Sequence, residues 1–466
     1  MRKALVAFVC LLVLSPALRA QDSLPVELRA SIDQAAAEVL QTTGAPSASV
    51  AVVRDGAVAY VHAYGLATIE PPTPATTEMR YSIGSISKQF TAAAILLLAE
   101  DRKLSLDDRV AKWLADLTRA NEVTIRQLLS MTSGYQDFWP QDYVMPPMML
   151  PTTAQQIMNA WAKIPLDFEP GTKWQYSNTN YVVAGAIVER VSGMPLVDFL
   201  QKRVFTRLGM KSVVNTDDAA LGPGDPMRYL RYAVGPPRQA PKEGKGWMFA
   251  AGELAMTARD LALWDISTIE QTILRPSSYQ AMQTNTLLKN GVATGYGLGV
   301  QLGQSAGRRV VSHTGEVSGF TAANQIYPDD RAAVVVLTNL DATGASSQLA
   351  GRIATLLFRA TSPDTAAAAA LAQAKAVFDG LQHGRIDRGL FTANANAYFT
   401  DGALADFASG LGPLGPPQEF EQATQSLRGG MVARSFRIKC GARTLRLTTF
   451  TMPDGRLEQY QIAATE

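Results

Sequence analysis

A serine and a lysine stand three residues apart at the start of an apolar stretch of this chain. The tetrad is Ser85-Ile86-Ser87-Lys88, and residues 90–99 that follow are apolar almost throughout. Side chains three apart on a helix are neighbours, with Cβ atoms about 5–6 Å apart. A helix that is apolar all round is buried, and burial disfavours the charged form of a lysine. The pattern therefore predicts that Lys88 takes the proton of Ser85, which becomes a nucleophile.

The alternative is chance spacing with an ordinary solvated lysine. Serine and lysine are common residues, so the tetrad alone is weak support for catalysis. Two facts favour the catalytic interpretation: the tetrad occurs once in the chain, and it opens a helix too apolar for a surface location.

Two further segments carry polar side chains that suit the same chemistry. Tyr176 and Asn178 lie in "KWQYSNTN", where a phenol could relay a proton and an amide could hold a substrate carbonyl. His313, Thr314 and Gly315 follow an apolar run, and a glycine there would let a substrate lie along the strand edge. Taken alone, a helix-capping loop tyrosine and a strand-end histidine are the structural alternatives.

The elements that must position these residues come from both ends of a long segment. Residues 47–65 read as two strands around a tight turn at Asp55-Gly56, and four more strands are expected in 295–302, 308–315, 320–330 and 331–339. Between them, roughly 85–275 is mostly helical in pattern. The order predicts a mixed α/β (α+β) fold: an antiparallel sheet flanked by helices, with an inserted helical subdomain.

A second domain is expected in the tail. Pro363 marks a boundary, and the alanine run after it favours a helix. Helices and then strands follow, with hairpin signals at Gly441 and at 453–455. We therefore expect a serine-nucleophile domain over 24–360 and a small α+β accessory domain over 366–466. The tail loosely resembles the nuclear transport factor 2-like group, which implies packing or substrate gating rather than chemistry.

The N-terminus and the charge balance bear on location and partners. Residues 1–20 combine basic residues, an apolar run and a small residue at the cut, which predicts a signal peptide and a secreted or periplasmic protein; a retained anchor is the alternative. Removal of residues 1–20 takes the formal charge of the chain from +2 to −1. A nearly neutral chain without a Lys/Arg tract gives no electrostatic case for nucleic acid, and no other segment predicts a membrane span. The sequence gives no indication of the oligomeric state.

Cysteine and histidine usage predicts neither a disulfide nor a metal site. With Cys10 in the expected signal, Cys440 stands alone and reads as a buried strand thiol. The three histidines, His62, His313 and His383, lie far apart in the sequence and form no zinc motif. No metal or other cofactor is expected.

The three polar motifs, in this order and at these separations, resemble the serine β-lactamase and penicillin-binding protein superfamily, in its class C β-lactamase-like branch with DD-peptidases and esterases. The resemblance spans roughly 25–360 and includes the phrases "LSLDDRV", "VTIRQLLSMTSG", "EPGTKWQYSN" and "YPDDRAAVVVLTN". It implies a hydrolase that acts through an acyl-enzyme on amide or ester bonds of a small molecule or short peptide. D-amino-acid peptides, β-lactams and small esters are the implied substrates.

The resemblance also implies a role for each residue. Ser85 would be acylated, Lys88 would accept its proton, and Tyr176 would pass the proton to the leaving group and later help to activate water. Asn178 would bind the substrate amide at the edge formed by His313, Thr314 and Gly315. The backbone N–H groups of Ser85 and Glu316 would form the oxyanion hole, worth about 3–4 kcal/mol per donor.

One departure from the family pattern concerns the third motif. Class C β-lactamases begin it with lysine, a fixed positive charge, whereas His313 is largely neutral at pH 7 with a reference pKa near 6.5. A histidine here resembles the DD-peptidase and esterase members, which puts efficient β-lactam hydrolysis in doubt. A non-catalytic sensor that is acylated without turnover is a second hypothesis.

The stretch "GQSAG" at 303–307 matches the nucleophile elbow of α/β-hydrolases. An elbow needs a strand, a sharp turn and then a helix, but Ser305 lies between two predicted strands. We therefore interpret it as a hairpin tip and not as a nucleophile.

Overall fold

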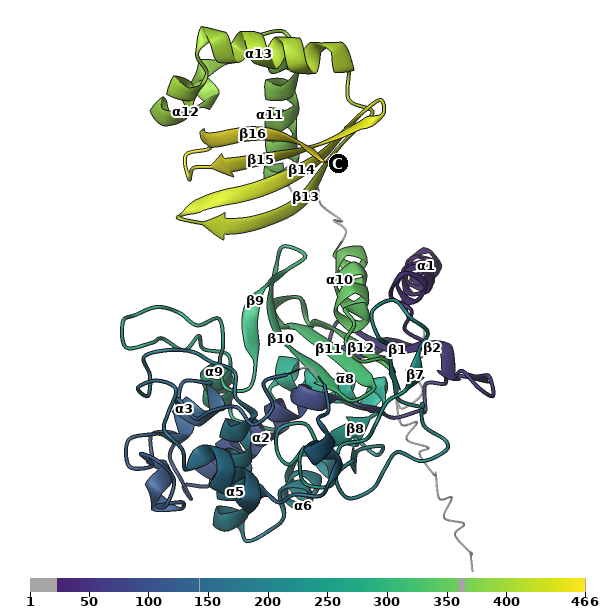
Figure 1. The fold of residues 1–466 in the computed structure, drawn as a ribbon, viewed down its shortest axis with the longest axis vertical. Helices are drawn as coiled ribbons and strands as arrows, with labels where there is room; N and C mark the ends of the chain where they lie inside the picture. Colours follow the sequence, from purple (N-terminus) through teal and green to yellow (C-terminus); the bar gives the residue numbers. More distant parts are fainter. Residues whose placement is uncertain (1–22, 142, 359–364, 466) are drawn as a thin grey trace, which may run out of the picture. The chain divides into compact units, whose positions relative to one another are not determined.

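The structure is a computed structural model that describes residues 23–141, 143–358 and 365–465. The predicted signal peptide and the boundary at Pro363 lie outside the described residues. The chain divides into two compact units, residues 1–359 and 360–466, which are considered one at a time (Figure 1).

The larger unit is built on an antiparallel sheet whose strands come from both ends of the segment. Its order is β3-β2-β1-β12-β11-β10-β9, so strands from before residue 75 lie beside strands from after residue 300 (Figure 1). This confirms the predicted architecture of sheet and inserted helical subdomain. The strands are β1 Ser47–Arg54, β2 Ala57–Thr68, β3 Thr73–Pro74, β9 Gln301–Ser305, β10 Arg308–Val317, β11 Phe320–Tyr327 and β12 Ala332–Thr338.

The central strands are apolar on both faces because both faces are covered. Val50 of β1 is paired with Val336 of β12, and these side chains belong to the core under α1 (Val26–Thr43) and α10 (Ala345–Leu357). Their neighbours Ala51 and Val335 point the opposite way into the core that contains the helical subdomain. Continuous rather than alternating hydrophobicity is what a sheet buried on two sides requires.

The helical subdomain surrounds α2 (Ser87–Glu100), in which every residue from Ser87 to Leu98 is buried. This helix is apolar on all sides, and α5 and α6 are among the elements that pack against it. The other helices of the larger unit are α3 Ile125–Leu129, α4 Ala154–Ile157, α5 Asn178–Ser192, α6 Leu196–Leu200, α7 Thr206–Leu208, α8 Ala258–Glu270 and α9 Pro276–Met282. Short strands complete it: β4 Tyr81–Ser82, β8 Leu254–Met256 and β5 Val214–Asn215 form one small sheet, and β6 Tyr229–Leu230 and β7 Arg238–Gln239 another.

One predicted strand is displaced. The sequence pattern placed a strand over 295–302, but β9 begins only at Gln301. Gly295 and Gly299 both adopt φ of +76°, in the left-handed region that ends extended structure. The stretch before Gln301, which carries Tyr296, is therefore a loop.

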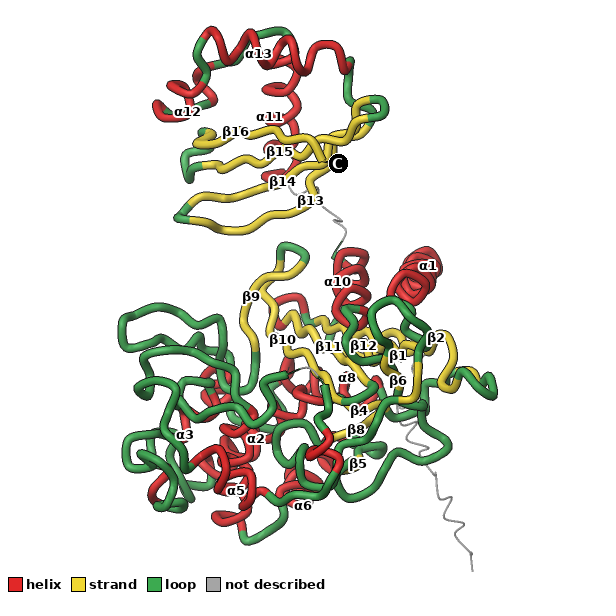
Figure 2. The backbone as a smooth tube through the Cα atoms, in the orientation of Figure 1, coloured by secondary structure: helices red, strands yellow, loops and turns green. Residues whose placement is uncertain are grey.

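The smaller unit is an α+β unit with a core of its own. Its antiparallel sheet has the order β13-β14-β15-β16, and Figure 2 shows these strands side by side. Cys440 is a buried thiol at the end of β14, as predicted. The elements are α11 Thr365–Gln382, α12 Ala393–Tyr398, α13 Asp401–Leu411, β13 Glu419–Arg428, β14 Met431–Cys440, β15 Arg443–Thr451 and β16 Leu457–Thr465.

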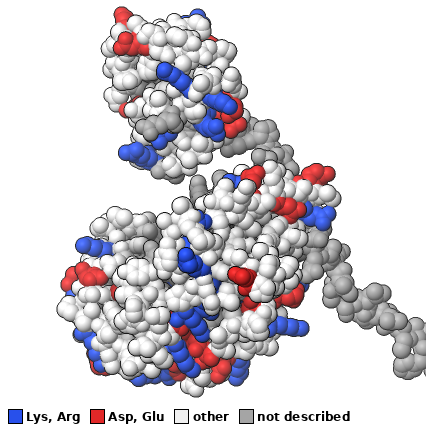
Figure 3. Space-filling view, turned by 45° about the vertical axis from the view of Figure 1, so that its right-hand side comes forward, with Lys and Arg blue, Asp and Glu red and all other residues white. Residues whose placement is uncertain are grey.

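Two features of the described residues bear on partners. None of their helices combines the length and the apolar character that crossing a membrane needs. On the face drawn in Figure 3, acidic and basic side chains of the larger unit are interspersed rather than gathered into a patch of one sign.

Candidate active site

Ser85 and Lys88 meet at the start of the buried helix. Ser85 lies in the 3-10 turn η1 (Gly84–Ile86), and α2 begins two residues later. The Nζ atom of Lys88 is 2.9 Å from the Oγ atom of Ser85, and Lys88 is 0% exposed. The side chains three apart are therefore in contact as predicted, although Ser85 precedes the α-helix instead of belonging to it.

Lys88 is surrounded by acceptors rather than by water. Its Nζ lies 2.8 Å from the Oδ1 of Asn178 and 2.8 Å from the carbonyl oxygen of Ala251. Burial lowers the pKa of Lys88 to about 7, and the carboxyl group of Asp137 opposes that shift. At pH 7 about half of the lysine is therefore neutral.

Tyr176 supplies the second polar contact of the serine. Its phenol lies 2.7 Å from the Oγ of Ser85 and donates to it. Burial raises the pKa of Tyr176, so the phenol keeps its proton at neutral pH. The Nζ of Lys88 is 5.0 Å from the centroid of the Tyr176 ring. Ser85 is thus held between the amine of Lys88 and a protonated phenol.

Asp137 fixes the amide that bonds to Lys88. It accepts a hydrogen bond of 2.9 Å from the backbone N–H of Asn178, the first residue of α5, and lies 3.4 Å from the Nδ2 of the same residue. The Oδ1 of Asn178 is thereby turned toward Lys88. Burial raises the pKa of Asp137. The sequence analysis did not identify Asp137.

The strand β10 brings the third motif to the serine. Gly315 leaves no room for a side chain, because a Cβ there would overlap the carbonyl oxygen of Ile83 and lie 3.2 Å from the backbone nitrogen of Ser85. A Cβ on Gly84 would likewise lie 2.7 Å from the backbone nitrogen of Glu316. The two nitrogen atoms predicted to form an oxyanion hole therefore lie at one junction of η1 and β10.

His313 is buried beside this junction and differs from an ordinary strand-end histidine. It is 2% exposed, and burial together with the charge of Lys88 lowers its pKa to about 4. Its ring centroid lies 6.3 Å from that of Tyr176. Thr314 is exposed, and its side chain points to the opposite face of the strand from His313, because successive side chains of a strand alternate between its two faces.

A cavity of about 620 Å³ opens in front of Ser85. All the residues predicted for the site except Lys88 and Gly315 line it, and both of these lie directly behind it. One wall is apolar and is made by Phe138, Trp139, Val144, Trp247 and Met248. The carboxylates of Asp137, Glu316 and Asp341 also line the cavity, and none of its described lining residues is Lys or Arg.

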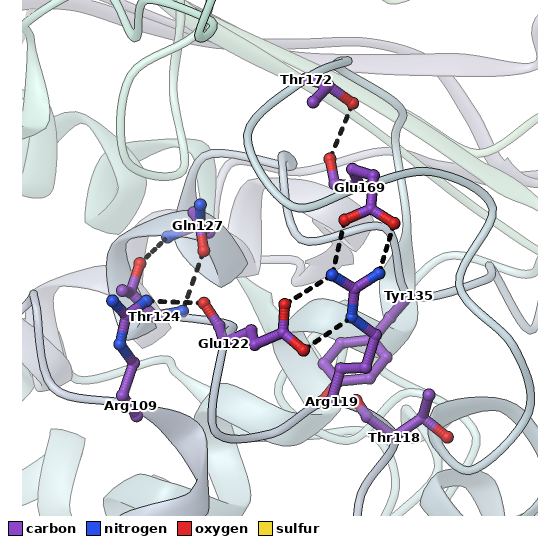
Figure 4. Close-up of polar contacts among 9 residues, drawn as sticks. All are labelled: Arg109, Thr118, Arg119, Glu122, Thr124, Gln127, Tyr135, Glu169 and Thr172. Atoms are coloured by element: carbon purple, nitrogen blue, oxygen red, sulfur yellow. Dashed lines mark hydrogen bonds and ion pairs between the residues drawn. The ribbon is translucent and has the colours of Figure 1, made fainter.

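The loops that carry Asp137 and Tyr176 are tied to one turn by polar contacts (Figure 4). Arg119 donates two hydrogen bonds of 2.5 Å to the carboxylate of Glu169, which begins the segment leading to Tyr176. Tyr135, two residues before Asp137, donates to the carbonyl oxygen of Thr118 at 3.0 Å. The turn at 118–119 thus anchors both loops.

The site residues that the sequence analysis missed share one property. Asp137, the carbonyl of Ala251 and Tyr296, whose phenol oxygen lies 2.9 Å from the Nε2 of His313, all lie in loops, and no periodic pattern marks such positions. The glycine-rich stretch around Tyr296 is the one signal in the sequence, and its pattern predicts a strand. Among the described residues, no group of His, Cys, Asp and Glu is arranged to hold a metal ion.

Comparison with known proteins identifies the family. The sequence matches the β-lactamase family over residues 32–357, well over half of the chain. The chain belongs to the β-lactamase family. Within it, the chain is 30% identical over 319 residues to a D-aminopeptidase of Brucella anthropi, covering 66% of this chain and 58% of that protein. Penicillin-binding protein 4* of Bacillus subtilis is 28% identical over 309 residues, covering 62% and 67%.

A solved structure agrees with the fold. A D-stereospecific amidohydrolase from Streptomyces superposes with a TM-score of 0.60 at 26% identity, covering 69% of this chain and 96% of that one. The chain spans less than two thirds of the length of the D-aminopeptidase.

Proposed function

We propose that this β-lactamase-family protein is a serine hydrolase that cleaves amide bonds through an acyl-enzyme at Ser85. The observation that carries the proposal is the arrangement of partners around Lys88. Two of its three contacts, the carbonyl oxygen of Ala251 and the Oδ1 of Asn178, can only accept hydrogen bonds. A neutral amine has two N–H groups and one lone pair, so the lone pair faces the Oγ of Ser85.

Acylation follows from this arrangement. The Oγ of Ser85 attacks the substrate carbonyl carbon while its proton moves to the Nζ of Lys88. The carbonyl becomes an oxyanion, which the backbone N–H groups of Ser85 and Glu316 stabilise. The proton then passes through the phenol of Tyr176 to the leaving nitrogen, the C–N bond breaks, and the amine departs neutral. Lys88 is again a neutral base.

Deacylation reverses the same proton path. A water molecule attacks the ester carbonyl, giving its proton to the Tyr176–Lys88 pair, and the proton returns to the Oγ of Ser85 as the ester bond breaks. Asn178 and the edge of β10 at Thr314 are proposed to hold the substrate backbone meanwhile. His313, Gly315 and Glu316 shape that edge.

The lining of the cavity supports a substrate with a positively charged amine and an apolar side chain. Three carboxylates and no described Lys or Arg side chain line the cavity, so a free amine is favoured over a carboxylate. The apolar wall offers area for an aromatic or branched side chain. Relatives named D-aminopeptidase and D-stereospecific amidohydrolase support the D configuration. We therefore propose amides of apolar D-amino acids as substrates.

The test uses matched amides and a nucleophile variant. D-phenylalanine amide is expected to be hydrolysed faster than its L enantiomer and faster than the N-acetylated amide, which lacks the positive charge. Ser85→Ala is expected to abolish turnover and the covalent adduct seen by intact mass spectrometry with a penicillin. Turnover by Ser85→Ala would refute the nucleophile. A lasting adduct on the parent without turnover of any amide would favour the sensor hypothesis.

We also propose that the smaller unit is an accessory domain without chemistry of its own, comparable to nuclear transport factor 2-like domains. Its buried apolar residues form a cluster separate from the two clusters of the larger unit, which supports independent folding. A chain ending at Arg359 is expected to retain acylation of Ser85 by a penicillin. Loss of acylation in a folded truncated chain would assign the unit a role in the site.

A further inference from the structure

The carbonyl oxygen of Ala251 that faces Lys88 belongs to a tight turn, residues 248–252. The backbone N–H groups of Ala251 and Gly252 both donate to the carbonyl oxygen of Met248, at 3.1 and 2.8 Å. Inside this turn Ala250 adopts a φ of +58°. A residue with a Cβ is unfavourable in the left-handed region and stays there only when its surroundings hold it. The turn therefore depends on contacts from outside it.

Glu253, the residue directly after the turn, provides one of these contacts. Its side-chain Oε1 accepts a hydrogen bond of 3.0 Å from the backbone N–H of Ala250. Its carbonyl oxygen accepts from the backbone N–H and the hydroxyl of Thr216, at 2.7 and 3.0 Å, so its own backbone is fixed. Ala250 and Glu253 are both buried. Loss of Oε1 would leave the N–H of Ala250 to find another acceptor, which favours a different conformation of the turn.

The 248–252 turn is fitted between two helices of the site. On one side the hydroxyl of Thr91 of α2 donates to the carbonyl oxygen of Ala250 at 2.7 Å, and the Nζ of Lys88 lies 2.8 Å from the carbonyl oxygen of Ala251. On the other side a Cβ on Gly185 of α5 would lie 2.4 Å from the Cβ of Ala250. A change in the turn therefore moves the carbonyl oxygen of Ala251 relative to Lys88.

Glu253 acts on Lys88 through this turn and not through charge. Burial raises the pKa of Glu253 to about 8 against the hydrogen bond from Ala250, and the neighbouring carboxyls of Asp217, Glu189 and Asp218 raise it further. The side chain is therefore mostly a neutral acid at pH 7, whose carbonyl oxygen still accepts a hydrogen bond. The charged group that shifts the pKa of Lys88 is instead Asp137.

We propose that Glu253 is a positioning residue for acylation: its Oε1 holds the 248–252 turn so that the carbonyl oxygen of Ala251 stays on Lys88 and aims the lone pair of the amine at Ser85. An ammonium group donates three hydrogens and a neutral amine two. Loss of a carbonyl acceptor therefore destabilises the charged form of Lys88 more than the neutral form, and it also frees the lone pair to turn away. The inference deepens the proposed function and rests on acyl transfer at Ser85.

The test compares two substitutions of Glu253 in the full chain. The rate of Ser85 acylation by a penicillin is measured against pH. Glu253→Gln keeps an oxygen that accepts from Ala250 and should keep the midpoint of the parent. Glu253→Met removes the acceptor at similar length and should lower the midpoint by about one pH unit, the effect of one hydrogen bond to a charged group. Its rate above the midpoint should fall about tenfold, because the amine is no longer aimed.

A merely structural role makes different predictions. It would lower the rate of Glu253→Met equally at every pH and leave the midpoint in place, and that result would overturn the proposal. A shift of the midpoint in Glu253→Gln equal to that in Glu253→Met would overturn it as well. Should Glu253→Met not fold, Glu253→Asp replaces it. Its carboxyl is one methylene too short for Ala250, so the same shift is expected.

Glu189→Met is the matched control. Glu189 of α5 also accepts from a backbone N–H at 3.0 Å, that of Leu196. It lies eleven residues along the helix from Asn178, a rise of about 16 Å. Glu189→Met therefore removes a hydrogen bond of the same kind far from Lys88, and the midpoint of the parent is expected. The shift of Glu253→Met appearing in Glu189→Met would contradict a role specific to Glu253.

The state of Lys88 is also measured without any reaction. Spectra of the full chain labelled with ¹³Cε-lysine follow each amine through its titration, and Lys88→Met identifies the signal of Lys88. In Glu253→Met this signal is expected to titrate about one pH unit below that of the parent, and an unchanged titration would overturn the proposal. Acylation of Ser85→Ala would instead remove the proposed function, while a shifted titration would still assign Glu253 its place in holding Lys88.

Discussion

Gly315 of β10 lies directly against the carbonyl oxygen of Ile83, with no room between them for a side chain. This contact brings the strand edge to the 3-10 turn that carries Ser85, and it sets the spacing of the Ser85 and Glu316 backbone nitrogens. Glycine is needed here for close approach and not for an unusual φ, since Gly315 is not among the positive-φ residues.

Gly315→Ala is expected to separate β10 from the turn and widen the spacing of the two N–H donors. Loss of one well-placed oxyanion donor costs about 10²–10³ in kcat. Acylation of Ser85 by a penicillin, followed by stopped-flow mass spectrometry, measures the effect. Gly351→Ala in α10 is the matched control, because a Cβ at Gly351 meets no described atom within 4 Å. Unchanged acylation in Gly315→Ala would remove the proposed oxyanion hole.

Lys88 sets the pH dependence of acylation. Only the neutral amine accepts a proton, so kcat/KM is expected to rise with pH through a midpoint of about 7, the pKa that burial gives Lys88. Lys88→Met should lower kcat by about 10²–10⁴-fold. Lys88→Arg should be equally inactive, because a guanidinium keeps its charge and is never a base. Activity in Lys88→Arg would show that charge rather than basicity is what the position supplies.

Asp137→Asn is expected to move that midpoint to lower pH. The negative charge of Asp137 stabilises the charged form of Lys88 and raises its pKa, so its removal lets the pKa fall further. The amide keeps an oxygen to accept from the backbone N–H of Asn178. Asp341→Asn removes another carboxylate of the cavity. Asp341 does not shift the pKa of Lys88, so this variant should keep the midpoint of the parent. A shift to higher pH in Asp137→Asn would contradict the assignment.

The chemistry on the buried helix was predictable because its geometry is local. A spacing of three residues fixes the distance between Ser85 and Lys88, and an apolar run on all sides fixes their burial. The long strands β1 and β12 could be predicted equally well from their runs of valine and alanine. Where helical or strand periodicity determines the neighbours of a residue, the sequence alone predicts its contacts.

The rest of the site depends on loops that meet only in the folded chain. Asp137 reaches Asn178 across 41 residues and the carbonyl of Ala251 reaches Lys88 across 163, and no spacing rule connects such positions. The place of Tyr296 could not be predicted from the sequence for a further reason. Its glycine-flanked stretch looks extended in sequence, but two left-handed glycines turn it into a loop.

Asp265 offers a test of the interior behind the active site. It is fully buried in α8; its Oδ1 accepts from the Nδ2 of Asn324, and its Oδ2 has no hydrogen-bond partner among the described residues. Burial raises its pKa to about 8, so the folded protein holds a proton there at neutral pH. The unfolded chain binds that proton only below about pH 4. Asp265 therefore makes the folded state less stable as pH rises from about 4 to about 8.

Asp265→Asn should remove this dependence, because an amide keeps the acceptor for Asn324 and carries no charge. The gain in unfolding free energy over the parent is expected to grow with pH by at most about 1.4 kcal/mol per unit and to level off above pH 8. Denaturation followed by tryptophan fluorescence reports the larger unit alone, since all six tryptophans lie in it. Asp55→Asn, at a carboxyl 89% exposed, should give a flat difference. Parallel curves for parent and Asp265→Asn would mean that Asp265 is ionised in the folded protein.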